Sequence, residues 1–418
     1  MALKTTSWRT VVIAALILLG PGAPRPAAAY SVLAHEANID ALWEGSIAPM
    51  LRARFPGTSL EDLQTARGYA YGGCVIQDLG YYPFGSKFFS NLVHYVRTGH
   101  FIATLIADAA DVNEYAFALG ALGHYSADTE GHPLAVNLAV ALMYPKLRKQ
   151  FGRTVTYEQS PKSHAMVEFS FDVVQVAAAA YAPEAYHTFI GFQVSKPLLE
   201  RAFSETYGIE MKDLFFNEDL AIGSYRHAVA TTIPEMTKVA WSKKRGEIQK
   251  VVPGATKERV VFNLRRAEYE KRFGADYAKP HGFARILSWV YMVIPKIGPF
   301  RILKFSVPTP EAERLFLESF TSTRQHFKAS LDALEAGHLT LADMDFDTGR
   351  RTKRGEYSMA DDTYDQLLGK LDDRKFAGVS DGLRSNLVDY YSGGNALPET
   401  IRQQLARLVI RAEDPVAH

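Results

Sequence analysis

Six side chains of the types that bind transition metals lie close together in the first half of the sequence. They are His124, Asp128 and His132 in the segment HYSADTEGH, His164 and Glu168 in the segment HAMVE, and His94 upstream. His124 and Asp128 are four positions apart, and so are His164 and Glu168. On a helix this spacing stacks both side chains on one face, about 5–6 Å apart at Cβ. Because imidazole and carboxylate together suit zinc, the pattern predicts a zinc site.

The histidines as a series strengthen this prediction. Five of the first six stand near an acidic residue or another candidate ligand, namely His35, His94, His124, His132 and His164. His100 is the exception, since it follows Gly99 and has no such neighbour. Burying several imidazoles beside carboxylates is costly without a cation, so the series favours metal binding over isolated structural histidines.

Composition limits the class of protein. The 418 residues are 47% hydrophobic and 22% charged, which is enough to build one large domain or two smaller ones. The formal net charge is +1, so electrostatics give no argument for a stable nucleic-acid partner. The single cysteine, Cys74, excludes an intramolecular disulfide, so stability must come from core packing, with a bound metal as an additional source.

Residues 1–29 have the features of a signal peptide. Lys4 and Arg9 precede an apolar stretch from Val11 to Leu19, and an A-x-A cleavage site lies at 27–29. The apolar stretch is short for a membrane span, and an uncleaved N-terminal anchor is the alternative. We therefore expect an exported protein, periplasmic or secreted. Cleavage would make Tyr30 the first residue and free its α-amino group.

Helical periodicity dominates the sequence and predicts an all-α fold. Convincing alternating strands are scarce, and VVFNL at 260–264 is the best candidate. Residues 78–90 contain several glycine and proline breakers and are expected to form a loop. Gly120 and Gly123 suggest close packing between helices. The expected helices cover residues 30–55, 60–77, 91–109, 114–128, 133–151 and 163–182.

The character of the chain changes near residue 250. We expect a helical metal-binding domain over residues 30–250 and a helical C-terminal region over 251–418, with amphipathic helices at 310–336 and 400–412. Residues 340–365 look like a polar loop. The apolar stretch 284–305 is interrupted by Pro295 and Pro299, so it is a poor membrane span. A buried helix and turn is favoured there over an interfacial hairpin that contacts lipid.

The ordered set of candidate ligands resembles the zinc-dependent phospholipase C family and, more distantly, the single-strand-specific zinc nucleases. Both groups place a mature N-terminal residue, a histidine, an aspartate, a histidine, an H-x-x-x-D pair, another histidine and an H-x-x-x-E/D pair in that order. The resemblance covers about residues 30–180. In this sequence the ordered positions are Tyr30, His35, Asp78, His94, His124 with Asp128, His132, and His164 with Glu168.

The resemblance implies a cluster of three zinc ions in an all-helical phospholipase C/nuclease-like domain. One ion would be held by Asp78, His94, His124 and Asp128, and a second by His132, His164 and Glu168. The third would take the α-amino nitrogen and carbonyl oxygen of Tyr30, together with His35 and a bridging Asp128. Because the amine is free only after cleavage, export would complete this third site.

The sequence departs from the family pattern at several positions. The family usually begins with tryptophan, whereas the residue here is Tyr30, whose ligand atoms belong to the backbone. Positions that hold choline in phosphatidylcholine-cleaving members are occupied by Leu33, Leu79 and Asn91, so a choline preference is not supported. Aromatic residues could line the pocket or simply pack in the core; these are Tyr81, Tyr82, Phe84 and Tyr95.

The resemblance favours metal-assisted hydrolysis of a phosphodiester, with phospholipid or another phosphodiester as substrate and contact with a membrane surface as an option. Asp78 would orient or deprotonate the attacking water, or serve as a ligand alone. Cys74 is either a packed thiol or an extra ligand. A nuclease and a non-catalytic zinc-binding envelope protein are the alternatives. His132, His164 and Glu168 offer three ligands where closed structural sites use four, which favours catalysis. Headgroup preference and oligomeric state stay open.

Overall fold

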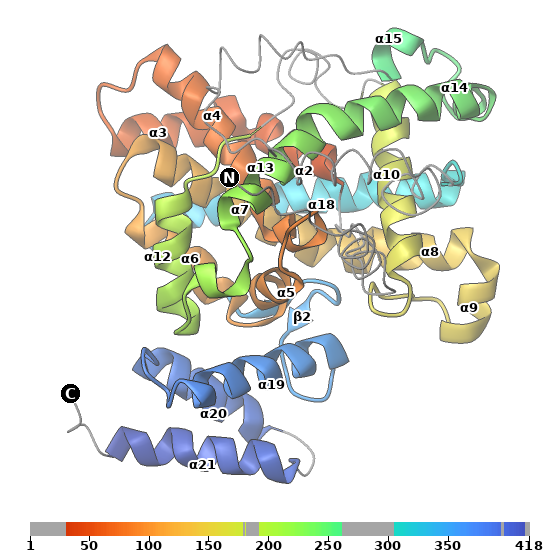
Figure 1. Cartoon of the computed structure of the whole chain (residues 1–418). Coiled ribbons are helices and arrows are strands. Elements are labelled where there is room, and N and C mark those ends of the chain that lie inside the picture. The colour runs from red at the N-terminus through yellow and green to blue at the C-terminus, as the bar shows by residue number, and fades with distance from the viewer. Residues whose placement is uncertain (1–30, 179, 181–191, 261–304, 394–396, 414–418) are drawn as a thin grey trace, which may run out of the picture.

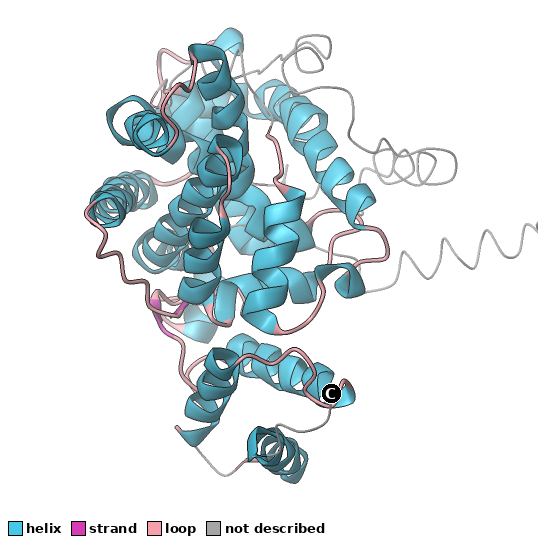
Figure 2. Cartoon of the chain, turned by 90° about the vertical axis from the view of Figure 1, so that its left-hand side faces the viewer, coloured by secondary structure: helices cyan, strands magenta, loops and turns pink. Residues whose placement is uncertain are grey.

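The computed structural model describes residues 31–178, 180, 192–260, 305–393 and 397–413, and within these residues the chain is all-α apart from two short strands (Figures 1 and 2). The first half contains α2 (Val32–Leu42), η1 (Trp43–Ile47), α3 (Ala48–Arg54), α4 (Leu60–Val75), η2 (Ile76–Tyr81), α5 (Lys87–Tyr95), α6 (Thr98–Asp108), α7 (Val112–Gly131), η3 (His132–Val136), α8 (Asn137–Met143), α9 (Pro145–Phe151) and α10 (Pro161–Ala177). The second half contains α12 (Lys196–Tyr207), η4 (Met211–Leu214), α13 (Glu218–His227), η5 (Ala228–Thr232), α14 (Ile233–Val251), α15 (Lys257–Val260), α18 (Pro310–Glu335), β1 (Met344–Asp345), β2 (Arg350–Arg351), α19 (Ser358–Asp373), α20 (Asp381–Ser392) and α21 (Glu399–Glu413).

Helices α4 and α7 form the centre of the fold, and glycine allows them to approach each other closely. A Cβ on Gly73 would lie 1.8 Å from the carbonyl oxygen of Phe117, and one on Gly120 would lie 2.0 Å from that of Ala70. Any larger residue would therefore force the helices apart. Gly123 faces α2 and α18, where a Cβ would lie about 3 Å from Ile39 and Phe327. The close packing expected at Gly120 and Gly123 is confirmed.

Helix α18 packs on α7, so residues after 305 share a core with the first half of the chain. Phe327 is fully buried, and the ring of Phe316 stacks on Phe171 of α10 with centroids 4.6 Å apart. The division of the chain at residue 250 stays a prediction. Helices α19, α20 and α21 lie below the larger helical body in Figure 1, and Figure 2 shows the strands where the chain passes between the two.

Most of the predicted helices are confirmed within a few residues, including α18 and α21. The helix predicted over 91–109 is divided into α5 and α6 at Arg97, which is buried and has a left-handed φ of 49°. The polar loop predicted over 340–365 is wrong in part, because β1, β2 and the start of α19 lie there. Asp345 and Asp347 are buried in this segment, since tyrosine hydroxyls and backbone N–H groups satisfy their carboxylates.

Several predictions fall on residues that the structure does not describe. They are the signal peptide over 1–29, Tyr30, most of the strand candidate at 260–264, and all but the last residue of the apolar stretch 284–305. Val260, at the start of the strand candidate, ends α15. Among the described helices, none is long and apolar enough to span a bilayer.

Candidate metal centre

The candidate ligands among the described residues come from six elements of the helical fold. Helix α7 and the π-turn η3 that follows it carry three of them. The N-terminus of α7 is fixed by Asp111, whose carboxylate accepts the N–H groups of Asn113 and Glu114. The ligands by segment are His35 on α2, Asp78 on η2, His94 on α5, His124 and Asp128 on α7, His132 at the start of η3, and His164 and Glu168 on α10.

The structure brings all eight of these described side chains into a buried centre, and each is at most 3% exposed. In each of three groups, one potential ligand atom per residue lies within 4.8 Å of the others. These groups are His35, His124 and Asp128; Asp78, His94 and His124; and His132, His164 and Glu168. Candidate ligands that are far apart in the sequence are therefore neighbours in the folded chain.

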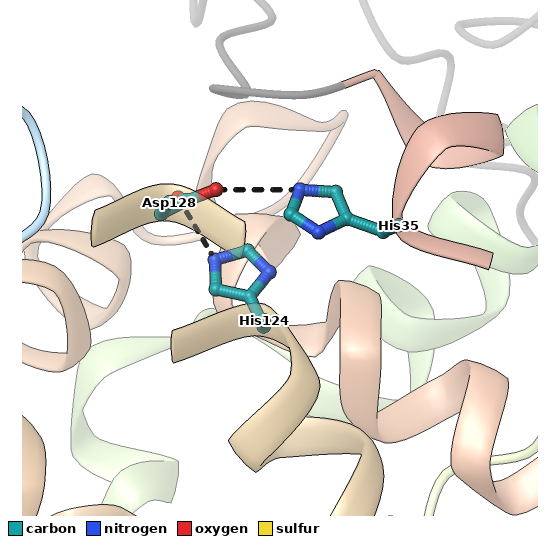
Figure 3. A group of neighbouring side chains, drawn as sticks. All are labelled: His35, His124 and Asp128. Carbon is teal, nitrogen blue, oxygen red and sulfur yellow. Dashed lines mark ion pairs between the residues drawn. The ribbon is translucent and has the colours of Figure 1, made fainter. Parts of the chain in front are cut away.

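The carboxylate of Asp128 faces two of the groups at once. Its Oδ1 lies 3.5 Å from His35 Nε2, whereas its Oδ2 lies 3.1 Å from His124 Nε2 and 3.5 Å from His94 Nε2. Figure 3 shows Asp128 beside both His35 and His124, whose rings stack with centroids 4.4 Å apart. One carboxylate with an oxygen directed to each side is suited to bridge two cations.

The spacing of the ligand atoms matches coordination better than hydrogen bonding. Two ligands of a tetrahedral zinc ion, each about 2.0–2.1 Å from it, lie about 3.3–3.4 Å apart. The Nε2 atoms of His94 and His124 are 3.4 Å apart, and His94 Nε2 lies 3.5 Å from Asp78 Oδ1. Two imidazole nitrogens facing each other at this distance fit a shared cation.

Backbone carbonyls hold three of the imidazoles in one orientation. Nδ1 of His94 lies 2.7 Å from the Ser90 carbonyl, Nδ1 of His124 lies 2.9 Å from that of Cys74, and Nε2 of His164 lies 2.6 Å from that of Val155. A carbonyl only accepts, so each of these nitrogens donates, and the other nitrogen of the ring is the one that can offer a lone pair to a metal. That second nitrogen faces the centre in each case, as metal binding requires.

Burial and neighbouring charge shift the pKa values of the imidazoles in different directions. Burial lowers the pKa of His132 to about 3 and that of His164 to about 4. Burial opposes the charged form of His94 too, but the carboxylates of Asp128 and Asp78 outweigh it and raise its pKa to about 10. Two imidazoles are therefore neutral and ready to ligate, and the third holds a proton in the place that a cation would take.

The carboxylates show the same need for positive charge. Burial raises the pKa of Asp78 and of Glu168 above their ordinary values. Burial also acts to raise the pKa of Asp128, but the imidazole of His124, with those of His94 and His35, holds this pKa well below its ordinary value. A buried set of carboxylates and neutral imidazoles with ligand spacing fits zinc.

The environments of Cys74 and of three tyrosines bear on alternatives that the sequence left open. Cys74 is buried, its Sγ donates to the Tyr71 carbonyl at 3.2 Å, and burial raises its thiol pKa, so its environment is that of a packed thiol. Tyr81 and Tyr95 contact His94, with ring centroids 5.9 and 6.0 Å away. Tyr82 instead stacks on Tyr225 in the core.

Two of the positions that the resemblance assigns to choline binding in phosphatidylcholine-cleaving members are occupied here by buried aliphatic residues. Leu33 and Leu79 are buried in the main core, and Phe84 packs against the same core. Aliphatic side chains at these positions offer no charge to a quaternary ammonium group. The absence of a choline preference stays a prediction.

Sequence reasoning missed two residues at the centre. Asp347, between β1 and β2, is buried with its Oδ1 3.4 Å from His132 Nε2. Tyr157 lies edge-on to His164 with ring centroids 6.0 Å apart, and 5.9 Å from the ring of Tyr81. The repeated aspartates of the segment DMDFDTG were the available signal, but their polarity suggested an exposed loop.

The described part of the chain is thus a helical fold with a buried histidine–carboxylate centre whose residue types suit zinc. Residues 45–217 match the family model described as zinc dependent phospholipase C, so this segment is similar to that family. The matched segment contains Asp78, His94 and the ligands of α7, η3 and α10. Comparison with curated proteins and with solved structures gave no significant match.

Proposed function

We propose that this protein is an exported phosphodiester hydrolase that cleaves the headgroup from a phospholipid, as a phospholipase C does. The observation that carries the proposal is the bridging position of Asp128 between two ligand groups, with a third group of three ligands on α7–η3 and α10. A centre of several cations suits a phosphate ester, because two oxygens of one phosphate can be bound together. Zinc bound here would neutralise the phosphate and supply a nucleophilic water near neutral pH.

The residues of the chain would perform the remaining steps. Asp78 is the proposed proton acceptor for the attacking water, since burial raises its pKa and its Oδ1 lies beside His94 at 3.5 Å. The group formed by His132, His164 and Glu168 offers three ligands and so leaves a position for substrate. Tyr81 and Tyr157, each in contact with a ligand imidazole, would exclude water on one side.

Export and the third metal site belong to the same proposal. His35 and Asp128 Oδ1 provide two ligands on the side of α2, and the amine and carbonyl of Tyr30 are proposed to complete that site. Contact with a lipid surface is expected of an enzyme whose substrate is a phospholipid. The aliphatic side chains of Leu33 and Leu79 support a substrate headgroup other than choline.

The test is an activity profile of the purified mature protein on phospholipid vesicles, a chromogenic phosphodiester and single-stranded DNA, each with and without a chelator. We expect chelator-sensitive release of the phosphorylated headgroup from the vesicles. His124→Ala should abolish this activity, because His124 belongs to two ligand groups. His100→Ala is the matched control, since His100 is an exposed histidine paired with Asp343 away from the centre.

Each outcome of this profile decides something. Cleavage of DNA without cleavage of lipid would replace the phospholipase by a nuclease. Tightly bound zinc with no hydrolysis of any substrate would favour a structural role. Full activity of His124→Ala would show that the assigned centre is not the site of the reaction.

A further inference from the structure

The β1–β2 hairpin, Met344–Arg351, reaches the metal centre from outside the segment that matches the family. The N–H of Phe346 donates to the carbonyl of His94 at 3.2 Å, and its ring lies 5.3 Å from that of His94 and 6.0 Å from that of His124. Asn137 Nδ2 donates to the carbonyl of Asp347 at 2.7 Å. The hairpin is thus fixed against two ligands and against the helix that follows η3.

The Asp347 side chain is held so that its two oxygens have different partners. Its Oδ2 accepts the hydroxyl of Tyr95 at 2.9 Å and also that of Tyr357. Its backbone N–H donates to Asp345 Oδ1 at 2.9 Å, which fixes the turn. Its Oδ1 is left to face His132 Nε2 at 3.4 Å, and both side chains are buried.

His132 differs in this respect from the imidazoles that backbone carbonyls hold. Its Nδ1 is buried and has no hydrogen-bond partner among the described residues, whereas its Nε2 faces a carboxylate. In the described part of the chain, Asp347 belongs to none of the three groups of potential ligand atoms that lie within 4.8 Å of one another. The 3.4 Å between Asp347 Oδ1 and His132 Nε2 equals the spacing of two ligands, but Asp347 forms no group of three with other potential ligands among the described residues, so we place it beside a ligand rather than in the ligand set.

We propose that Asp347 is a positioning residue of the metal centre. Its carboxylate accepts the Nε2–H of His132 and so presents the lone pair of Nδ1 to the cation shared with His164 and Glu168. A carboxylate behind a ligand histidine fixes its tautomer and ring orientation and makes the imidazole a stronger ligand. The present separation exceeds that of an ordinary N–H···O hydrogen bond, and we expect it to shorten when a cation binds.

This inference rests on the metal centre of the proposed function but not on its substrate. It gives the C-terminal region a role in the chemistry, since the hairpin would complete a site that otherwise lies between α7 and α10. The test therefore measures metal binding and not hydrolysis.

The variant is Asp347→Asn, which keeps the shape of the side chain and removes its charge. The matched control is Asp343→Asn, because Asp343 is a carboxylate just before the same hairpin and pairs with the exposed His100. Zinc affinity of the full chain is measured by competition with chelators of graded strength, and the coordination geometry by the visible spectrum of the cobalt-loaded protein. We expect one cation to bind about 10–100-fold more weakly in Asp347→Asn, with an altered cobalt spectrum, and wild-type behaviour in the control.

Unchanged affinity for every cation in a folded Asp347→Asn protein would overturn the inference. Asp347→Glu retains the anion and should recover part of the lost affinity; affinity as low as that of Asn would show that the charge does not act through His132. If Asp347→Asn does not fold, Tyr357→Phe removes one hydroxyl that holds Oδ2, and it should weaken the same cation several-fold. No change there would also overturn the inference. A wild-type chain that binds no zinc would instead refute the centre itself.

Discussion

Replacing Asp128 by asparagine should remove two of the three cations and leave the third. The two oxygens of Asp128 face different ligand groups: Oδ1 lies 3.5 Å from His35 Nε2 in one group, and Oδ2 lies 3.5 Å from His94 Nε2 in the other. An asparagine carries no charge, and its amide nitrogen does not bind metal, so both groups lose an anionic ligand. The group of His132, His164 and Glu168 does not include this carboxylate.

The size of the effect follows from the number of ligands. A zinc ion with four protein ligands binds with roughly 10–16 kcal/mol in small structural sites at neutral pH. If the four ligands contribute equally, each contributes about 2.5–4 kcal/mol, or roughly two to three orders of magnitude in affinity. At a free zinc concentration about tenfold above the weakest wild-type dissociation constant, the bound zinc should fall from about three ions per chain to about one.

The assay is elemental analysis of protein equilibrated in zinc buffers, with circular dichroism of the metal-free form to confirm folding. His164→Ala is the matched comparison, because it affects the other group and should leave about two ions bound. Three ions bound to Asp128→Asn with wild-type affinity would refute the bridging geometry. Loss of all three ions from His164→Ala would refute the independence of the groups.

Two further predictions concern protons and the chain terminus. Because its pKa is about 10, His94 is protonated in the metal-free protein at pH 7.5. Zinc binding should therefore release at least one proton, and the zinc affinity should rise about tenfold per pH unit. Titration calorimetry in buffers of different ionisation enthalpy measures the number of protons released, and a value of zero would contradict the prediction. His132 and His164, with pKa values of about 3 and 4, should release none. Extra residues kept before Tyr30 should cost one zinc ion by elemental analysis, and full occupancy would exclude the amine as ligand.

The sequence alone determined the local part of the site. Helical periodicity places His124 above Asp128, and His164 above Glu168, whatever the rest of the chain does, because residues four apart share a face. The structure has these pairs at 3.1 and 3.7 Å, as the spacing predicts. The all-α fold could be predicted from the scarcity of alternating strand patterns, because periodicity too is a property of residues that are close in the sequence.

Which pairs meet was decided by tertiary packing. Asp78 reaches His94 and His124 because α4 leads into η2 while lying closely against α7, and this contact depends on Gly73 and Gly120. Periodicity carries no information about such distant contacts, so only the resemblance to a family grouped these ligands in advance. The resemblance did not extend to Asp347, whose burial depends on hydroxyls from Tyr95 and Tyr357. A polar segment is expected in water unless partners distant in sequence satisfy it, and only the folded chain shows those partners.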